Sequence, residues 1–180
     1  YGVIDNYNEL YVEGGEISNS NGNAIENYAE KELIGKVKIT GGRISGTLYS
    51  ICNYNNSEIE MLGGEIESSG LGIYNNANAK VLIDGGTINT EKEAIQNNNG
   101  TTGGSVEIRS GKISSKLRSA IRNVNRGNNK TVVKITGGEI ESTNTKYNNN
   151  DPMYTSAIYN DGYNEVILGV NDEYIPSQEN

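Results

Sequence analysis

The side chains that could do chemistry in this chain are carboxylates, tyrosines and one thiol. Histidine is absent and Cys52 is the only cysteine, which excludes an internal disulfide and a cysteine-based zinc cluster. A cysteine nucleophile needs a nearby base or basic cluster, and the sequence around Cys52 has neither. The aspartates are dispersed, at Asp5, Asp84, Asp151, Asp161 and Asp172. We therefore expect no catalytic residue, no metal site and no cofactor.

Tyrosine is the residue type here that best suits ligand binding, because its ring stacks on sugars or anchors a protein partner. Tyr74 and Tyr159 each sit between Ile and Asn in a recurring Ile-x-Asn motif, and Tyr147 and Tyr154 lie in the longest polar segment, 143–156. These four tyrosines are the candidate ligand-binding residues. The alternative, which we favour, is that tyrosines at turns shield apolar surface.

Composition and charge exclude several classes of partner. The 180 residues contain no Phe and no Trp, and their formal net charge is −8. Binding to nucleic acid or to anionic membranes needs clustered Lys and Arg, whereas the basic residues here are scattered. No stretch approaches the roughly 20 apolar residues of a membrane span. We expect neither nucleic-acid binding nor membrane insertion.

Two short motifs alternate along the whole chain and must position these side chains. The first motif is apolar-x-apolar-x-Gly-Gly-x-Ile, with copies at LYVEGGEIS (10–18), VKITGGRIS (37–45), IEMLGGEIE (59–67), VLIDGGTIN (81–89), VEIRSGKIS (106–114), VKITGGEIE (133–141) and a degenerate VILGVNDEYI (166–175). The second is small-Ile-x-Asn, as in AIEN (24–27), SICN (50–53), GIYN (72–75), AIQN (94–97), AIRN (120–123) and AIYN (157–160), after an opening VIDN (3–6).

The alternation predicts an all-β fold, a parallel β-helix of about seven coils with 22–27 residues in a typical coil. Val-x-Ile has the period of a half-buried strand, and paired glycines suit a corner, whereas in a helix each would cost about 1 kcal/mol. One coil cannot bury enough apolar surface to fold alone, so the coils must stack, about 4.8 Å apart. The chain is expected to be one domain, 1–180, and a fragment of a longer protein.

Equivalent positions in successive coils test this stacking. Outer columns alternate in charge, so Lys38 should face Glu60 and Glu107 should face Lys134. The asparagine column is unbroken, and we expect it to form a structural ladder that satisfies turn amides; its members are Asn6, Asn27, Asn53, Asn75, Asn97, Asn123 and Asn160. Loops of variable length collect between the motifs, at 28–36, 98–105, 124–132 and 143–156.

With motifs such as VKITGGRIS and AIYN, the whole chain resembles the β-helical repeats of Gram-positive cell-surface, adhesin-like proteins of the pectin-lyase-like superfamily. The resemblance implies a right-handed parallel β-helix that is exported to the bacterial surface for attachment or display. Its expected partners are carbohydrate or a host matrix protein. Flanking domains or self-association would cap the strand edges of the end coils.

The same superfamily contains pectin-degrading enzymes, so a polysaccharide lyase or hydrolase is the alternative function. Polygalacturonase-like sites use an aspartate cluster, Gly-His-Gly and Arg-Ile-Lys, but this chain has no His and its nearest match is Arg43-Ile44-Ser45. A catalytic pair of carboxylates is not excluded by the sequence, because the columns of a solenoid bring many glutamates close together. The prediction is a non-enzymatic adhesin-like or stalk domain outside the cell.

Overall fold

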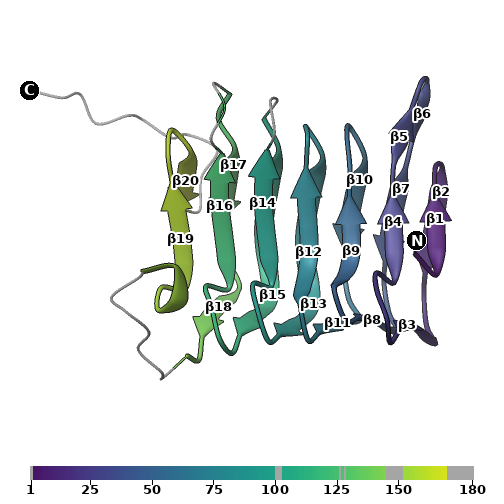
Figure 1. Cartoon of the computed structure of the whole chain (residues 1–180), viewed down its shortest axis with the longest axis horizontal. Coiled ribbons are helices and arrows are strands. Elements are labelled where there is room, and N and C mark those ends of the chain that lie inside the picture. The colour runs from purple at the N-terminus through teal and green to yellow at the C-terminus, as the bar shows by residue number, and fades with distance from the viewer. Residues whose placement is uncertain (1, 100–102, 126, 128, 145–151, 170–180) are drawn as a thin grey trace, which may run out of the picture.

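The computed structural model of the protein describes residues 2–99, 103–125, 127, 129–144 and 152–169, and it shows an elongated β-solenoid (Figure 1). Parallel strands form three faces, which we call A, B and C. Face A carries the small-Ile-x-Asn motifs and consists of β1 (Ile4–Asn6), β4 (Ile25–Asn27), β9 (Tyr49–Asn53), β12 (Leu71–Asn76), β14 (Ile95–Asn99), β16 (Ile121–Asn125) and β19 (Ile158–Asp161).

Faces B and C form one sheet that bends at the Gly-Gly corner. Face B consists of β2 (Glu9–Val12), β7 (Lys36–Ile39), β10 (Glu58–Met61), the first halves of β13 (Lys80–Thr90) and β15 (Ser105–Ser115), β17 (Val132–Ile135) and β20 (Glu165–Leu168). Face C consists of β3 (Glu16–Asn19), β8 (Arg43–Gly46), β11 (Glu65–Ser68), the second halves of β13 and β15, and β18 (Glu139–Ser142).

The stack contains slightly fewer complete coils than the sequence predicted. Five coils, those of β4, β9, β12, β14 and β16, have a neighbour on both sides. The coil of β1 and the coil of β19 lie at the ends of the described stack, and the latter contributes only β19 and β20. The all-β parallel solenoid is confirmed, with five complete inner coils in place of about seven equal ones. Its right-handedness stays a prediction.

Two elements depart from the repeat. A two-stranded antiparallel hairpin of β5 (Ala29–Glu30) and β6 (Leu33–Ile34) interrupts the second coil and projects beyond the β1–β2 connection (Figure 1). A short 3-10 helix, η1 (Pro152–Tyr154), precedes β19. Both lie in segments that the sequence marked as variable loops.

The strand register agrees with the columns read from the sequence. Lys38 pairs with Glu60 across β7 and β10, and Glu107 pairs with Lys134 across β15 and β17. Four apolar side chains from each of the five inner coils point inward, one from face A, two from face B and one from face C. In the third coil these are Ile51, Ile59, Met61 and Ile66, and all are buried. Burying each contributes about 1.5–3 kcal/mol, and stacking joins them into one continuous core.

The asparagine column forms an unbroken ladder inside face A, as predicted. Asn6 donates to Asn27 (2.7 Å), and the same Nδ2–Oδ1 bond recurs at every step as far as Asn160. Each amide also reaches backbone carbonyls. Asn27, for example, donates to the carbonyls of Gly35 and Glu58 at 3.0 and 3.1 Å. The ladder satisfies the polar backbone of the turn after face A, where no strand pairing exists.

The Gly-Gly corner requires glycine for two different reasons. The second glycine of each pair has a positive φ, as at Gly64 (φ 81°), which disfavours a side chain. The first lies against the preceding coil, so a Cβ at Gly63 would be 2.6 Å from the Thr40 carbonyl oxygen. Ser110 occupies this position in the fifth coil, and the pairing of β13 with β15 shifts register there. This irregularity in the pairing thus coincides with the Ser110 side chain.

Removing an inner rung of the ladder should destabilise the fold strongly. Asn75 accepts from Asn53 at 2.9 Å, and its Nδ2 lies 2.9 Å from both Asn97 Oδ1 and the Ala79 carbonyl oxygen. Asn75→Ala leaves buried partners unpaired and should lower the free energy of unfolding by about 2–4 kcal/mol in urea titrations. The exposed Asn56→Ala should change it by less than about 0.5 kcal/mol. Equal effects would contradict a structural role for the ladder.

The glycine column gives a second matched pair of variants. Gly63→Ala places a methyl group against the Thr40 carbonyl and should cost about 1–3 kcal/mol in thermal or urea unfolding. Gly14→Ala, at the same position of the first coil, meets nothing within 4 Å. It should be neutral in this 180-residue chain. A neutral Gly63→Ala would show that the coils separate readily at this corner.

Candidate binding surfaces

Five tyrosines cover the outer side of face A and its corner with face B. The rings of Tyr7, Tyr28 and Tyr54 stack in series, with centroids 5.2 and 5.1 Å apart. Tyr49 and Tyr74 form a second stack at 5.3 Å, and Tyr54 meets Tyr74 edge-on at 6.1 Å. Such pairs contribute about 0.5–1.5 kcal/mol beyond the area they bury. Tyr7, Tyr28 and Tyr54 follow the coil spacing because each comes directly after a ladder asparagine.

Tyr74, a predicted ligand-binding residue, belongs to this aromatic series. Its ring contacts two other rings, and its hydroxyl oxygen accepts a hydrogen bond from Asn98 at 2.9 Å. The series shields Cys52, which occupies the same outward column on the preceding coil yet has no exposed surface. This arrangement agrees with the interpretation that tyrosines cover apolar surface.

The other three candidate tyrosines do not join Tyr74. Tyr159 shares its column but lies three coils away, about 14 Å along the stack. Tyr154 lies in η1, where the Arg118 guanidinium covers its ring at 5.3 Å. Tyr147 lies outside the described residues. The four positions therefore do not form one site among the residues that the structure describes.

A buried ion pair holds the segment around Tyr154. The Glu93 carboxylate is only 1 % exposed, and Arg118 and Arg122 lie 3.2 and 3.9 Å from its Oε1. Ser119 donates to the Met153 carbonyl from its backbone N–H (3.0 Å) and its hydroxyl (2.6 Å). These contacts attach η1 to face A. They give Tyr154 a structural role in addition to the predicted binding role.

A groove runs along face B, which the sequence did not indicate. It has a volume of about 580 Å³ and crosses β2, β7, β10, β13 and β15. Tyr11 is 59 % exposed at one end, and Leu82 lies farther along the same column. Two outward columns line the groove, so its residues repeat at the coil spacing. This periodicity suits an extended ligand with repeating units.

Charges in the face B groove are largely paired with one another. Lys38 lies 2.9 Å from Glu60, and Lys80 lies 3.2 Å from Glu58. The hydrogen bond that Lys38 donates to Glu60 raises the pKa of Lys38, and the hydrogen bond that the Tyr11 hydroxyl donates to Glu9 raises the pKa of Tyr11. The groove thus offers donors and acceptors with little net charge.

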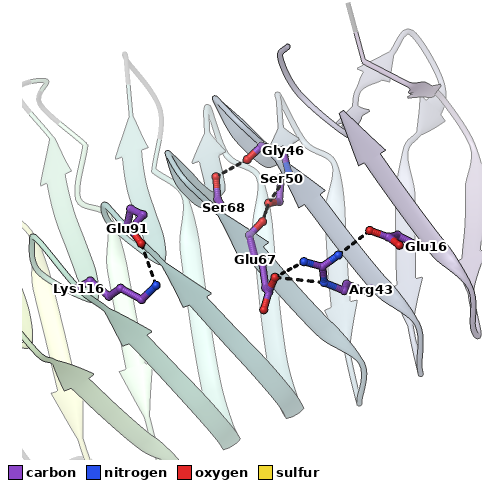
Figure 2. Close-up of polar contacts among 8 residues, drawn as sticks. All are labelled: Glu16, Arg43, Gly46, Ser50, Glu67, Ser68, Glu91 and Lys116. Carbon is purple, nitrogen blue, oxygen red and sulfur yellow. Dashed lines mark hydrogen bonds and ion pairs between the residues drawn. The ribbon is translucent and has the colours of Figure 1, made fainter. Parts of the chain in front are cut away.

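A second, smaller hollow of about 380 Å³ lies on face C and is lined mainly by polar side chains. Figure 2 shows Arg43 between two carboxylates, 2.5 Å from Glu16 and in contact with Glu67. One coil beyond Glu67, Glu91 pairs with Lys116 at 2.8 Å. Every charged side chain in this picture has a partner on a neighbouring coil, so these contacts act as clamps between coils.

The described residues contain no group of three or more His, Cys, Asp or Glu side chains placed to hold a metal ion. Within the same part of the chain, no helix is long and apolar enough to cross a membrane. Comparisons with protein families, with curated proteins and with solved structures found no match to this chain.

The burial of Cys52 predicts how stability depends on pH. Burial raises the pKa of this thiol from the ordinary 9.0 to about 12, so the folded state holds the proton more tightly than the unfolded state. Its contribution to stability is complete below about pH 9 and is lost as the pH rises towards 12. Urea unfolding at pH 8, 9, 10 and 11 should therefore show falling stability.

A cysteine-free variant separates this effect from that of the tyrosines. Burial also raises the pKa of Tyr28 and Tyr54 above the ordinary 10.0. The stabilising contribution of all three groups therefore falls as the pH rises. Cys52→Ala should flatten the decline mainly between about pH 8.5 and 9.5, where an unfolded thiol with the ordinary pKa of 9.0 ionises and an unfolded tyrosine with the ordinary pKa of 10.0 is still mostly protonated. The native thiol should also resist alkylation at pH 8 unless the protein unfolds. Rapid labelling of the folded chain would contradict its burial.

Proposed function

We propose that this chain is a non-enzymatic, adhesin-like display domain of a bacterial cell-surface protein, and that its face B groove binds an extended neutral polysaccharide. The observation that carries the proposal is the groove itself, about 580 Å³ in volume and lined by repeating outward columns. Five strands at the coil spacing give it a length of about 19 Å. That length suits several sugar units in a row better than one small ligand.

The charge of the groove supports a neutral ligand over an acidic one. Four glutamates and three lysines line it, namely Glu9, Glu58, Glu60, Glu107, Lys36, Lys38 and Lys80. An acidic polymer would need unpaired cations, but Lys38 and Lys80 already face carboxylates. Sugar hydroxyls can donate to carboxylates and accept from ammonium groups without disturbing these pairs. The exposed Tyr11 ring supplies an apolar surface for the C–H face of a sugar.

The location outside the cell rests on the resemblance to cell-surface β-helical repeats and on the physical character of the chain. A rigid stack with paired charges on its outside suits display away from the cell wall. A plain stalk would use the same stack with no ligand, and a host matrix protein is the second class of partner. The binding experiment below separates these from a polysaccharide.

One observation favours the enzyme alternative. Glu58 and Glu60 lie on the same strand and both line the groove, with Cα atoms about 7 Å apart, which would allow the carboxyl separation of inverting glycosidases. Each carboxylate is paired with a lysine, and neither is enclosed in an apolar site that would favour the protonated acid. We therefore propose binding without turnover.

A glycan and matrix-protein array, with a parallel assay for released reducing or unsaturated sugar ends, tests the proposal. We expect saturable binding to neutral polysaccharides and no turnover. Tyr11→Ala should raise the Kd at least about tenfold by removing an exposed ring from the groove. Tyr163→Ala is the control, because that tyrosine is 82 % exposed and does not line the groove.

Each outcome of this experiment decides between functions. Release of sugar ends that disappears in a Glu58→Gln, Glu60→Gln variant would overturn the non-enzymatic proposal. Binding to a matrix protein alone would replace the polysaccharide with a protein partner. The absence of any saturable ligand would favour the stalk.

A further inference from the structure

A third hollow lies between the β5–β6 hairpin and the β1–β2 connection. It has a volume of about 540 Å³ and is lined by Tyr7, Glu30, Lys31, Glu32 and Leu33. We call it the hairpin pocket. Its size falls within the range of small-molecule sites, about 300–1,000 Å³. Its lining combines one aromatic ring and one aliphatic side chain with three charged groups.

The hairpin pocket contains apolar surface that folding leaves uncovered. Tyr7 is 43 % exposed and Leu33 is 52 % exposed, although the chain buries most of its large apolar side chains. Leu33 is held by the hairpin, where β5 and β6 pair through Ala29–Ile34 and Glu30–Leu33 and Lys31 adopts a positive φ of 58°. The hairpin thus presents Leu33 across from Tyr7 on a defined backbone.

Tyr7 is fixed in place before any ligand arrives. Its ring stacks on Tyr28 at 5.2 Å with the planes only 18° apart, and Tyr28 stacks in turn on Tyr54. The Tyr28 hydroxyl donates to the Glu26 carboxylate, which restrains the middle ring. Tyr7 is the terminal ring of this stack among the described residues. A ring that is already ordered loses little side-chain entropy on binding, which favours affinity.

We infer that the hairpin pocket binds a single neutral sugar ring, stacked on Tyr7 and against Leu33. A sugar ring has a C–H face that packs on apolar groups and a rim of hydroxyls that needs donors and acceptors. Glu30 and Glu32 would accept from these hydroxyls, and Lys31 would donate to them. Two carboxylates against one ammonium group disfavour an acidic sugar.

This inference rests on the proposed function, because it assigns a terminal sugar to a pocket beside the groove. Tyr7 lies two residues before Glu9, which lines the groove. A polysaccharide in the groove could thus place one end in the hairpin pocket. A short peptide that pairs with the hairpin edge is the competing occupant, and it would need no contact with the Tyr7 ring.

Saturation-transfer NMR with methyl glycosides of glucose, galactose, mannose, N-acetylglucosamine and glucuronic acid tests the inference on the full chain. At least one neutral glycoside should receive saturation on its ring C–H protons, and glucuronide should bind more weakly. Leu33→Ser should raise the Kd at least about tenfold without affecting folding, because this side chain is exposed. Tyr7→Ala should do the same, and circular dichroism and urea unfolding verify that it folds.

Two controls separate the hairpin pocket from the groove. Leu117→Ser changes a leucine of similar exposure that does not line the hairpin pocket, and Tyr11→Ala changes the groove; both should leave monosaccharide binding intact. If Tyr11→Ala loses monosaccharide binding and Leu33→Ser retains it, the sugar binds in the groove, and the assignment to the hairpin pocket is wrong. Absence of any monosaccharide signal would overturn the hairpin pocket even if polysaccharides bind on the array. Glucuronide binding as tight as the neutral sugars would overturn its charge preference.

Discussion

Hydrogen bonding from coil to coil is the constraint on which this fold depends. No single coil buries enough surface to offset its ordering entropy, so the coils must stack in one register. The asparagine ladder enforces that register where strand pairing ends, and all six of its Nδ2–Oδ1 bonds run in the same direction. Aligned bonds polarise one another, which strengthens the column as a whole. The ladder therefore links every coil of the described stack.

A fixed register determines what the outer surface can do. Each outward residue lies about 4.8 Å from its equivalents, so charges of opposite sign in one column become ion pairs, as with Lys38 and Glu60. Arg43 goes further and bridges Glu16 in its own column and Glu67 in the next. Exposed pairs of this kind stabilise little, about 0–1 kcal/mol each. Their larger effect is to leave a surface with many polar groups and little free charge, suited to neutral hydroxyls.

Features that repeat from coil to coil could be predicted from the sequence, whereas features that depend on one loop or on side-chain conformation could not. The inward isoleucines, the ladder and the pairing of Lys38 with Glu60 were predictable, because each position recurs in several coils and its column can be checked against its neighbours. The stack of Tyr7 on Tyr28 was not, because the sequence places each directly after a ladder asparagine but does not give the side-chain conformations that bring the two rings together. The β5–β6 hairpin was also missed. Its six residues, 29–34, belong to neither repeated motif, and four charged or small residues precede Leu33 and Ile34 and hide the apolar pattern.

The distribution of exposed apolar side chains bears on whether the chain is a stalk or a binding domain. Of the ten large apolar side chains that are exposed among the described residues, five lie within the first two coils, and three of these, Tyr7, Tyr11 and Leu33, line the groove or the hairpin pocket. A spacer gains nothing from apolar groups in water, and scattered ones would serve it as well as clustered ones. A hairpin that adds uncovered leucine and isoleucine to an otherwise regular stack costs solubility. Contact with a ligand would explain why these apolar side chains are exposed. For this reason we favour a binding role for the first two coils over a plain stalk.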